Sequence, residues 1–187
     1  MNKDLFFKCV EFTKENEGGY TNDPNDHGGP TSRGGVTLAE LRHLSATILG
    51  HEWDKNHDGV IDEKDLQLMT DDDLEIAYKA YYDDDMDNLH SETLVIKLFD
   101  FRYNCGPVSG VKLLQRAINN IHPGAVVVDG QIGSHTVAVA NSIPQEALTV
   151  QFIDEAMEHY RAIVAHDPTQ NKYLKGWTNR ANRLPNV

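Results

Sequence analysis

Apolar residues recur along most of the chain at the spacing of an amphipathic helix. Near the start, Leu5, Phe6, Cys9 and Phe12 share one face of a predicted helix over residues 2–16, and a pair of glycines then gives a stop signal. Periodicity, capping residues and Pro107 predict further helices over 37–50, from Thr70 onward, over 92–104, over 107–120, from Ser134, from Ser142 or Pro144 to about 165, and over 170–184. The pattern therefore predicts a mainly helical protein.

Two segments lack the helical period. Residues 20–36 are rich in glycine and proline among polar residues, which is typical of a loop or a small β-hairpin. The short apolar run over residues 125–128 is either a strand or a turn. The sequence thus predicts a mainly helical domain with a small β element near residues 20–36.

Length and charge narrow the possible functions. A chain of 187 residues is predicted to be one domain, and it carries 29 acidic against 17 basic residues, for a net charge of −12. This balance excludes a nucleic-acid binder, which needs a basic face, and it gives no electrostatic help in approaching an anionic cell wall. No segment is long and apolar enough to suggest stable membrane association. We expect a monomer.

The first residues and the two cysteines bear on the compartment. Charges interrupt the N-terminal segment every few residues, so no secretory signal peptide is expected and the protein is predicted to fold in the cytoplasm. Cys9 and Cys105 lie far apart without metal-ligand spacing; they are either two buried thiols or one long-range disulfide. The nine histidines show no HExxH pattern, which argues against a zinc amidase.

Residues 54–65, DKNHDGVIDEKD, follow the pattern of an EF-hand calcium loop. Oxygen atoms at alternating positions of a tight loop can converge on one hard cation, and Gly59 stands where the loop must turn. The predicted ligands are Asp54, Asn56, Asp58, the carbonyl of Val60, Asp62 and Asp65. Asp65 replaces the usual glutamate, as in dockerin loops, which makes Mg²⁺ a more credible competitor of Ca²⁺. The alternative is that this segment is only a solvent-exposed acidic turn. Calcium sensors usually pair two such loops, so a single loop favours a structural role.

Glu17 is the first candidate for a catalytic residue. Glycoside hydrolysis needs a protonated acid at the leaving oxygen and usually a second carboxylate. Glu17 falls at the end of the first predicted helix, where the negative end of the helix dipole should raise its pKa, as a general acid requires. Asp26 lies beyond a turn in a polar segment where it can stay ionised, and Thr31 follows it. A lone glutamate at a helix end, however, is usually only a solvated surface residue.

The segment EGGYTNDPNDHGGPTSRGGVT resembles the opening of glycoside hydrolase family 108. Further motifs follow in the order that the family shows. They are Tyr81-Tyr82, Asp100 to Asn104 with Gly106, Gln115, Asp129-Gly130 with Gly133 and Thr136, and Gly176-Trp177 with Asn179-Arg180. The later motifs resemble a peptidoglycan-binding region over about 95–187, and the calcium loop looks like an insertion at about 50–70 within one domain.

The resemblance implies a lysozyme-like fold and N-acetylmuramidase activity on peptidoglycan. It identifies Glu17 as the general acid, with Asp26 and Thr31 as its partners. The gap between Asp26 and Thr31 is one residue shorter than in phage lysozymes, so Thr37 is a possible substitute for Thr31. Four residues are predicted to contact sugar or to pack in the core: Tyr20, Tyr103, Asn104 and Trp177.

These inferences lead to an endolysin that hydrolyses the β-1,4 bond between N-acetylmuramic acid and N-acetylglucosamine. It would collect in the host cytoplasm and reach the wall once another protein breaches the membrane; a prophage protein or a secretion-system effector is the alternative. Two rival functions stay open. A lytic transglycosylase would leave anhydromuramic ends, and a calcium-dependent wall-binding module would bind without turnover.

Overall fold

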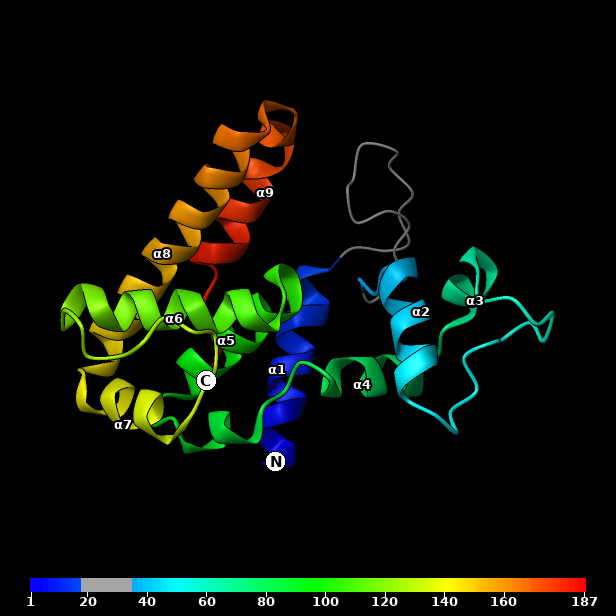
Figure 1. The fold of residues 1–187 in the computed structure, drawn as a ribbon, viewed down its shortest axis with the longest axis horizontal. Helices are drawn as coiled ribbons and strands as arrows, with labels where there is room; N and C mark the ends of the chain where they lie inside the picture. The colour runs from blue at the N-terminus through cyan, green and yellow to red at the C-terminus, as the bar shows by residue number, and fades with distance from the viewer. Residues whose placement is uncertain (18–34) are drawn as a thin grey trace. The chain divides into compact units, whose positions relative to one another are not determined.

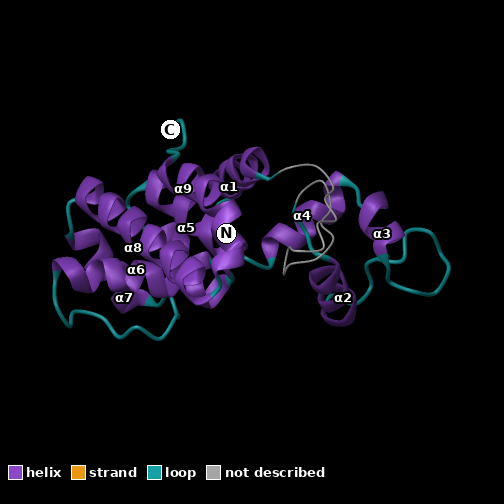
Figure 2. Cartoon of the chain, turned by 90° about the horizontal axis from the view of Figure 1, so that it is seen from above, coloured by secondary structure: helices purple, strands orange, loops and turns teal. Residues whose placement is uncertain are grey.

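The computed structural model describes residues 1–17 and 35–187, and its regular structure is helical, which confirms the predicted fold class (Figure 2). Its helices are α1 (Lys3–Asn16), α2 (Leu38–Thr47), α3 (Glu63–Leu68), α4 (Asp71–Lys79), α5 (Glu92–Cys105), α6 (Pro107–Ile121), α7 (Ser134–Ser142), α8 (Gln145–His166) and α9 (Asn171–Asn182), with 3₁₀ turns at Asp84–Asn88 and Pro168–Gln170. The run 125–128 is a bend followed by irregular backbone, and it forms no strand. Nearly all of the predicted hairpin lies outside the described residues.

The chain folds into two compact units. Unit 1 comprises residues 1–12 and 81–187, and unit 2 comprises residues 13–80. No described helix is both long and apolar enough to cross a membrane.

Unit 1 is built around α5, which is buried on every side from Leu94 to Arg102. Helix α6 packs against α5 and α8, and α9 runs back along α8 (Figure 1). A helix enclosed on all sides is expected to be apolar all round, and α5 departs from this at Lys97 and Asp100. Both are fully buried, so each needs a partner.

The partners of these two buried charges come from α9 and the residues after it. The Lys97 ammonium donates to the carbonyl oxygens of Arg180 and Arg183, each at 2.9 Å, which caps the C-terminal end of α9. It also lies over the rings of Phe12 and Phe101. Burial lowers the pKa of Lys97 to about 8. Buried polar contacts thus fasten α9 to α5.

Unit 2 has short helices that begin at side-chain caps. Thr37 accepts a hydrogen bond from the amide of Glu40 at the start of α2, as the sequence predicts. Thr70 and Asp73 form a complete capping box at the start of α4, and Asp62 and Asp65 form another at α3, a helix that the hydrophobic pattern misses. Among the described residues of unit 2, the apolar core beneath these helices is formed by Val36, Leu41, Leu44, Trp53, Leu66, Leu74, Ala77 and Tyr78.

Candidate active site and sugar-binding surface

Glu17 is the first residue after α1, as the sequence predicts. Its amide donates to the carbonyl oxygen of Thr13 at 3.0 Å, so the last turn of the helix holds its backbone. The side chain is half-buried. The carbonyl groups at this end of a helix point toward the C-terminus, and their partial negative charge favours the protonated form of a nearby carboxyl group.

Gly35 lies against the Glu17 carboxyl group. A Cβ atom at Gly35 would stand 2.4 Å from Oε2 and 2.6 Å from Cδ of Glu17, which is too close for any side chain. The φ angle of Gly35 is +79°, a value that non-glycine residues rarely adopt. Gly35 therefore lets the backbone approach the carboxyl group. Sequence reasoning missed this role, although the pair Gly34-Gly35 just before the α2 cap was a signal for it.

Three of the predicted site residues lie outside the described residues. They are Tyr20, Asp26 and Thr31. Thr37, the substitute considered for Thr31, is described, and its hydroxyl accepts a bond from the Glu40 amide. It therefore has the structural role that its capping position indicated.

Side chains of the predicted calcium loop turn toward the loop's own backbone. Asp54 accepts from the amides of Asp58 and Gly59, at 3.2 and 2.7 Å. Asn56 accepts from the amide of Asp58, and Asp58 from that of Val60. Gly59 has a φ angle of +85°, so it provides the sharp turn that the pattern predicts. Within residues 1–17 and 35–187, no three His, Cys, Asp or Glu side chains gather in a way that could hold a metal ion.

Asp65, the last predicted ligand, is fully buried. Its Oδ1 accepts from the amides of Lys55 and Asn56, and its Oδ2 from the amide of Asp62. Two bonds saturate Oδ1, whereas Oδ2 keeps one lone pair. Asp65 thus holds the loop closed, and only Oδ2 has capacity for a further partner.

The loop is also fastened to α4, which sequence reasoning missed. Asp73 is buried, and its Oδ1 meets His51 Nε2 at 2.6 Å and Lys55 Nζ at 2.7 Å. Burial alone would raise the pKa of Asp73, but bonds from Lys55, Thr70 and His51 outweigh it and lower the pKa to about 2. Asp73 therefore stays ionised, and it links the loop to its neighbouring helix.

In unit 1 the structure brings two of the predicted sugar contacts together around Tyr160. The Tyr160 hydroxyl donates to Oδ1 of Asn104 at 2.8 Å, and its ring stacks on Trp177 with centroids 5.2 Å apart. Tyr103 contacts a different ring, that of Tyr81, at 5.0 Å. Tyr160 was not among the predicted residues, because a tyrosine in the middle of a long helix gives no signal of its neighbours.

Other motif residues pair with one another structurally. Asp100 and Arg180 form a two-pronged ion pair, with Nε and Nη2 at 3.0 and 2.8 Å from the two carboxylate oxygens. Gln115 donates to Asp129 and accepts from the amide of Gly130, both at 2.8 Å. These residues therefore fix α9 on α5, and the loop before α7 on α6.

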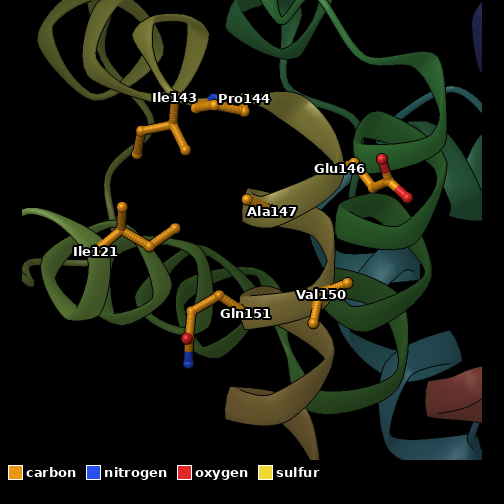
Figure 3. Close-up of a pocket in the computed structure, with 7 residues that line it drawn as sticks. All are labelled: Ile121, Ile143, Pro144, Glu146, Ala147, Val150 and Gln151. Carbon is orange, nitrogen blue, oxygen red and sulfur yellow. The ribbon is translucent and has the colours of Figure 1, made fainter.

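Unit 1 also carries an open apolar depression of about 700 Å³ beside the start of α8. Ile121, Ile143 and Ala147 face this space, whereas the Glu146 carboxylate points away from it (Figure 3). Ile121, Ile143 and Ala147 therefore offer apolar contacts to a ligand, and none of the three carries a carboxyl group. It lacks the carboxyl chemistry of a glycosidase site.

Comparisons with known proteins show the family to which this chain belongs. Residues 10–106, just over half of the chain, match glycosyl hydrolase 108, and residues 109–182 match a predicted peptidoglycan domain. The chain belongs to the glycosyl hydrolase 108 family; it is a glycoside hydrolase of the muramidase type with a mainly α, lysozyme-like fold. Its substrate is peptidoglycan.

A solved structure agrees with the assignment. SagA of Brucella abortus matches with a TM-score of 0.74 and 25% identity, over 97% of this chain and 91% of that one. No curated protein matches the chain. The family match confirms the enzyme class that the opening motif predicts.

Proposed function

We propose that the enzyme is an N-acetylmuramidase that hydrolyses the β-1,4 bond between N-acetylmuramic acid and N-acetylglucosamine. The observation that carries the proposal is the placement of Glu17 at the end of α1 with its carboxyl group against Gly35. Membership of glycosyl hydrolase 108 supports the same reaction class. Glycine at position 35 leaves room for the Glu17 carboxyl group in this position, and a general acid must be positioned close to the leaving oxygen.

In the proposed mechanism Glu17 protonates the oxygen of the leaving sugar. Asp26 stays ionised and, with Thr31, positions the water that attacks the anomeric carbon. The Glu17 proton passes to the leaving oxygen as the glycosidic bond breaks. The water supplies the new hydroxyl and gives its other proton to Asp26, and exchange with solvent then returns both carboxyl groups to their starting states. The helix end favours the protonated carboxyl group of Glu17 before the reaction.

The test is the Glu17→Gln variant on purified sacculi, because glutamine keeps the shape and cannot donate the proton. A general acid contributes about 10²–10⁴-fold, so the lytic rate should fall by about that factor. Glu15→Gln, an exposed change at the next-to-last position of α1, is the matched control. A Glu17 variant that lyses at the wild-type rate would overturn the assignment.

Gly35 offers a second test. In Gly35→Ala the new methyl group would displace the Glu17 carboxyl group, so we expect activity to fall more than stability. Gly50→Ala is a close control, because Gly50 has a φ of +86° and open space around its Cα. It carries the same backbone strain without touching Glu17. Equal activity loss in both variants would contradict a positional role for Gly35.

Product analysis separates the proposed hydrolase from its nearest rival. A muramidase releases fragments with reducing N-acetylmuramic acid ends, and a lytic transglycosylase releases anhydro ends, which mass spectrometry distinguishes by the mass of one water. Binding to sacculi without any soluble product would instead favour a wall-binding module. The physiological role that we propose is that of a phage endolysin reaching the wall after membrane breach. Lysis of expressing cells only after permeabilisation would support it.

We also propose that residues 54–65 bind Ca²⁺ as a structural clip. Support comes from the spacing of Asp54, Asn56 and Asp58, from the turn at Gly59 and from the remaining lone pair on Oδ2 of Asp65. Side chains now bonded to backbone amides would have to supply their remaining lone pairs to the ion. Its charge would offset the local excess of carboxylates.

Calcium that binds only the folded state must stabilise it, by about 2.7 kcal/mol at 100 times the dissociation constant. The melting temperature should therefore rise in CaCl₂ and fall again with chelator. Asp54→Ala should abolish the calcium response. Asp84→Ala, which removes a carboxylate in unit 1, should leave the response intact. A melting temperature insensitive to both calcium and chelator would sink the proposal, and an equal response to MgCl₂ would make Mg²⁺ the competitor.

A further inference from the structure

We propose that Asn104, Tyr160 and Trp177 form a subsite in unit 1 that selects the 2-acetamido group of the glycan, with Tyr160 as its positioning residue. This inference rests on the proposed function, since it concerns how the same substrate is recognised. Neither the family match nor the structural likeness assigns these residues a role. The three side chains come from α5, α8 and α9, which are far apart in the sequence.

Tyr160 is the centre of the cluster and is almost fully buried, with 1% of its surface exposed. One end of this side chain, the hydroxyl, bonds to Asn104, and its face stacks on Trp177 at an interplanar angle of 19°. A buried tyrosine hydroxyl needs a hydrogen-bond partner, so its bond to Asn104 is well determined. Tyr160 therefore contacts both the amide of Asn104 and the indole ring of Trp177.

The Asn104 amide faces the Tyr160 hydroxyl with its oxygen atom. Oδ1 of Asn104 accepts from the Tyr160 hydroxyl and also from Cys105 Sγ at 3.4 Å. Asn104 is exposed, and its Nδ2 group lies on the side of the amide away from Oδ1. Within the described parts of the chain, Nδ2 donates to no other group. The site thus presents a preoriented donor to solvent, which suits an acceptor such as the carbonyl oxygen of an acetamido group.

The aromatic ring that stacks on Tyr160 suits the rest of the same group. Trp177 is half-buried, and Tyr173 lies 5.7 Å from it, tilted by 33°. Half-buried rings offer apolar surface to a methyl group or to the C–H face of a sugar. A donor for the carbonyl beside a surface for the methyl recognises an N-acetyl group better than a hydroxyl.

The simpler alternative is that Asn104 only satisfies the Tyr160 hydroxyl. Asn104→Asp separates the two, because a carboxylate still accepts the Tyr160 bond but replaces the outward donor with an acceptor. Under the simple alternative the substitution leaves sugar binding unchanged. Under the proposal it removes the hydrogen bond to the acetamido carbonyl and places repulsive charge there.

Binding is measured by calorimetry in the Glu17→Gln background with two neutral β-1,4 trisaccharides, tri-N-acetylchitotriose and cellotriose, which lacks acetamido groups. We expect a preference for the first. Asn104→Asp should weaken its binding by about 2- to 10-fold, the usual range for one hydrogen bond, and leave cellotriose unaffected. Asn171→Asp, an exposed isosteric change at the start of α9, is the matched control and should not alter either affinity.

Tyr160→Phe tests positioning, because it keeps the ring and removes the hydroxyl. It should reduce the acetamido preference and, in the active enzyme, raise KM more than it lowers kcat; a purely structural role would lower stability without changing the preference. Equal binding of the two trisaccharides by the unsubstituted protein, or an unchanged preference in Asn104→Asp, would overturn the inference. Neither result depends on Glu17, so the catalytic proposal stands or falls separately on its own lytic assay.

Discussion

The two units of the chain are held together in different ways. In unit 1 the helices α6, α7, α8 and α9 begin without a side-chain cap, and they are held by packing: α6 and α8 pack on α5, α9 packs on α8, and α7 packs on α6 and α8. In unit 2 the helices α2, α3 and α4 are 10, 6 and 9 residues long, and each begins with a side-chain cap. Helices this short are not stable alone, so local polar bonds matter more where the core is small.

The buried charges show the same contrast. Lys97 in unit 1 is surrounded by the rings of Phe12 and Phe101 and bonds to carbonyl groups. Asp73 in unit 2 is surrounded by hydrogen-bond donors from three sides. We infer that unit 1 is sensitive to lost volume and unit 2 to lost polar partners. Each unit has one tryptophan, Trp177 and Trp53, so their indole NMR signals report on the units separately.

The largest expected effect is that of Phe101→Ala in unit 1. Phe101 is fully buried against Phe152, 5.4 Å away edge to face, and its removal leaves a cavity in the core. We expect a loss of about 3–5 kcal/mol in the free energy of unfolding, measured by urea denaturation. Val150→Ala, on an exposed face of α8, should change it by less than about 0.5 kcal/mol. A small loss at Phe101 would mean that unit 1 does not depend on apolar packing.

Asp73→Asn should come next, and its effect should depend on pH. The folded-state pKa of about 2 lies below the ordinary value of 3.8, so ionised Asp73 stabilises the fold fully at pH values above about 4. That stability is lost as the pH falls from about 4 toward 2. The variant should therefore be about 2–3 kcal/mol less stable at pH 7, and the difference should shrink at low pH. A difference that is constant from pH 7 to pH 2 would show that charge is not the cause.

Thr70→Ala should cost about 1 kcal/mol, because it removes the cap of α4 and the hydroxyl bond to Asp73. Ser134→Ala is the comparison in unit 1, at the exposed first position of α7, where no side-chain cap is present. It should cost less than about 0.5 kcal/mol. Equal losses at the two positions would remove the distinction between capped and packed helices.

The smallest effect should be that of Lys79→Ala. Lys79 pairs with Glu75 one turn earlier on α4 at 2.8 Å, and both side chains are substantially exposed. Such a pair contributes about 0.3–0.5 kcal/mol and is screened by salt. The loss should disappear in high salt. A larger, salt-independent loss would show that Lys79 contributes packing to unit 2 in addition to charge.

Local signals in the sequence predicted most of the helices. Apolar spacing and capping residues placed α1, α2, α4 and α5 within a few residues of their observed ends, and Pro107 opens α6 as expected. Helix α3 was missed, because six residues are too few to show a period. The enzyme class followed from the opening motif and is confirmed by the family match. The calcium loop, Asp26 and Thr31 stay predictions.

By itself the sequence determined most of the helical segments, the place of Glu17 at the end of α1 and the chemistry that its motif implies. These features depend on residues within about one helical turn of each other, and such short-range preferences can be recognised in the sequence alone. Only the tertiary structure decided that Gly35 meets the Glu17 carboxyl group, that Asp73 receives His51 and Lys55, and that Tyr160 joins Asn104 to Trp177. Those contacts join residues from 17 to 56 positions apart. Packing of whole helices selects such partners, and no local pattern encodes that choice.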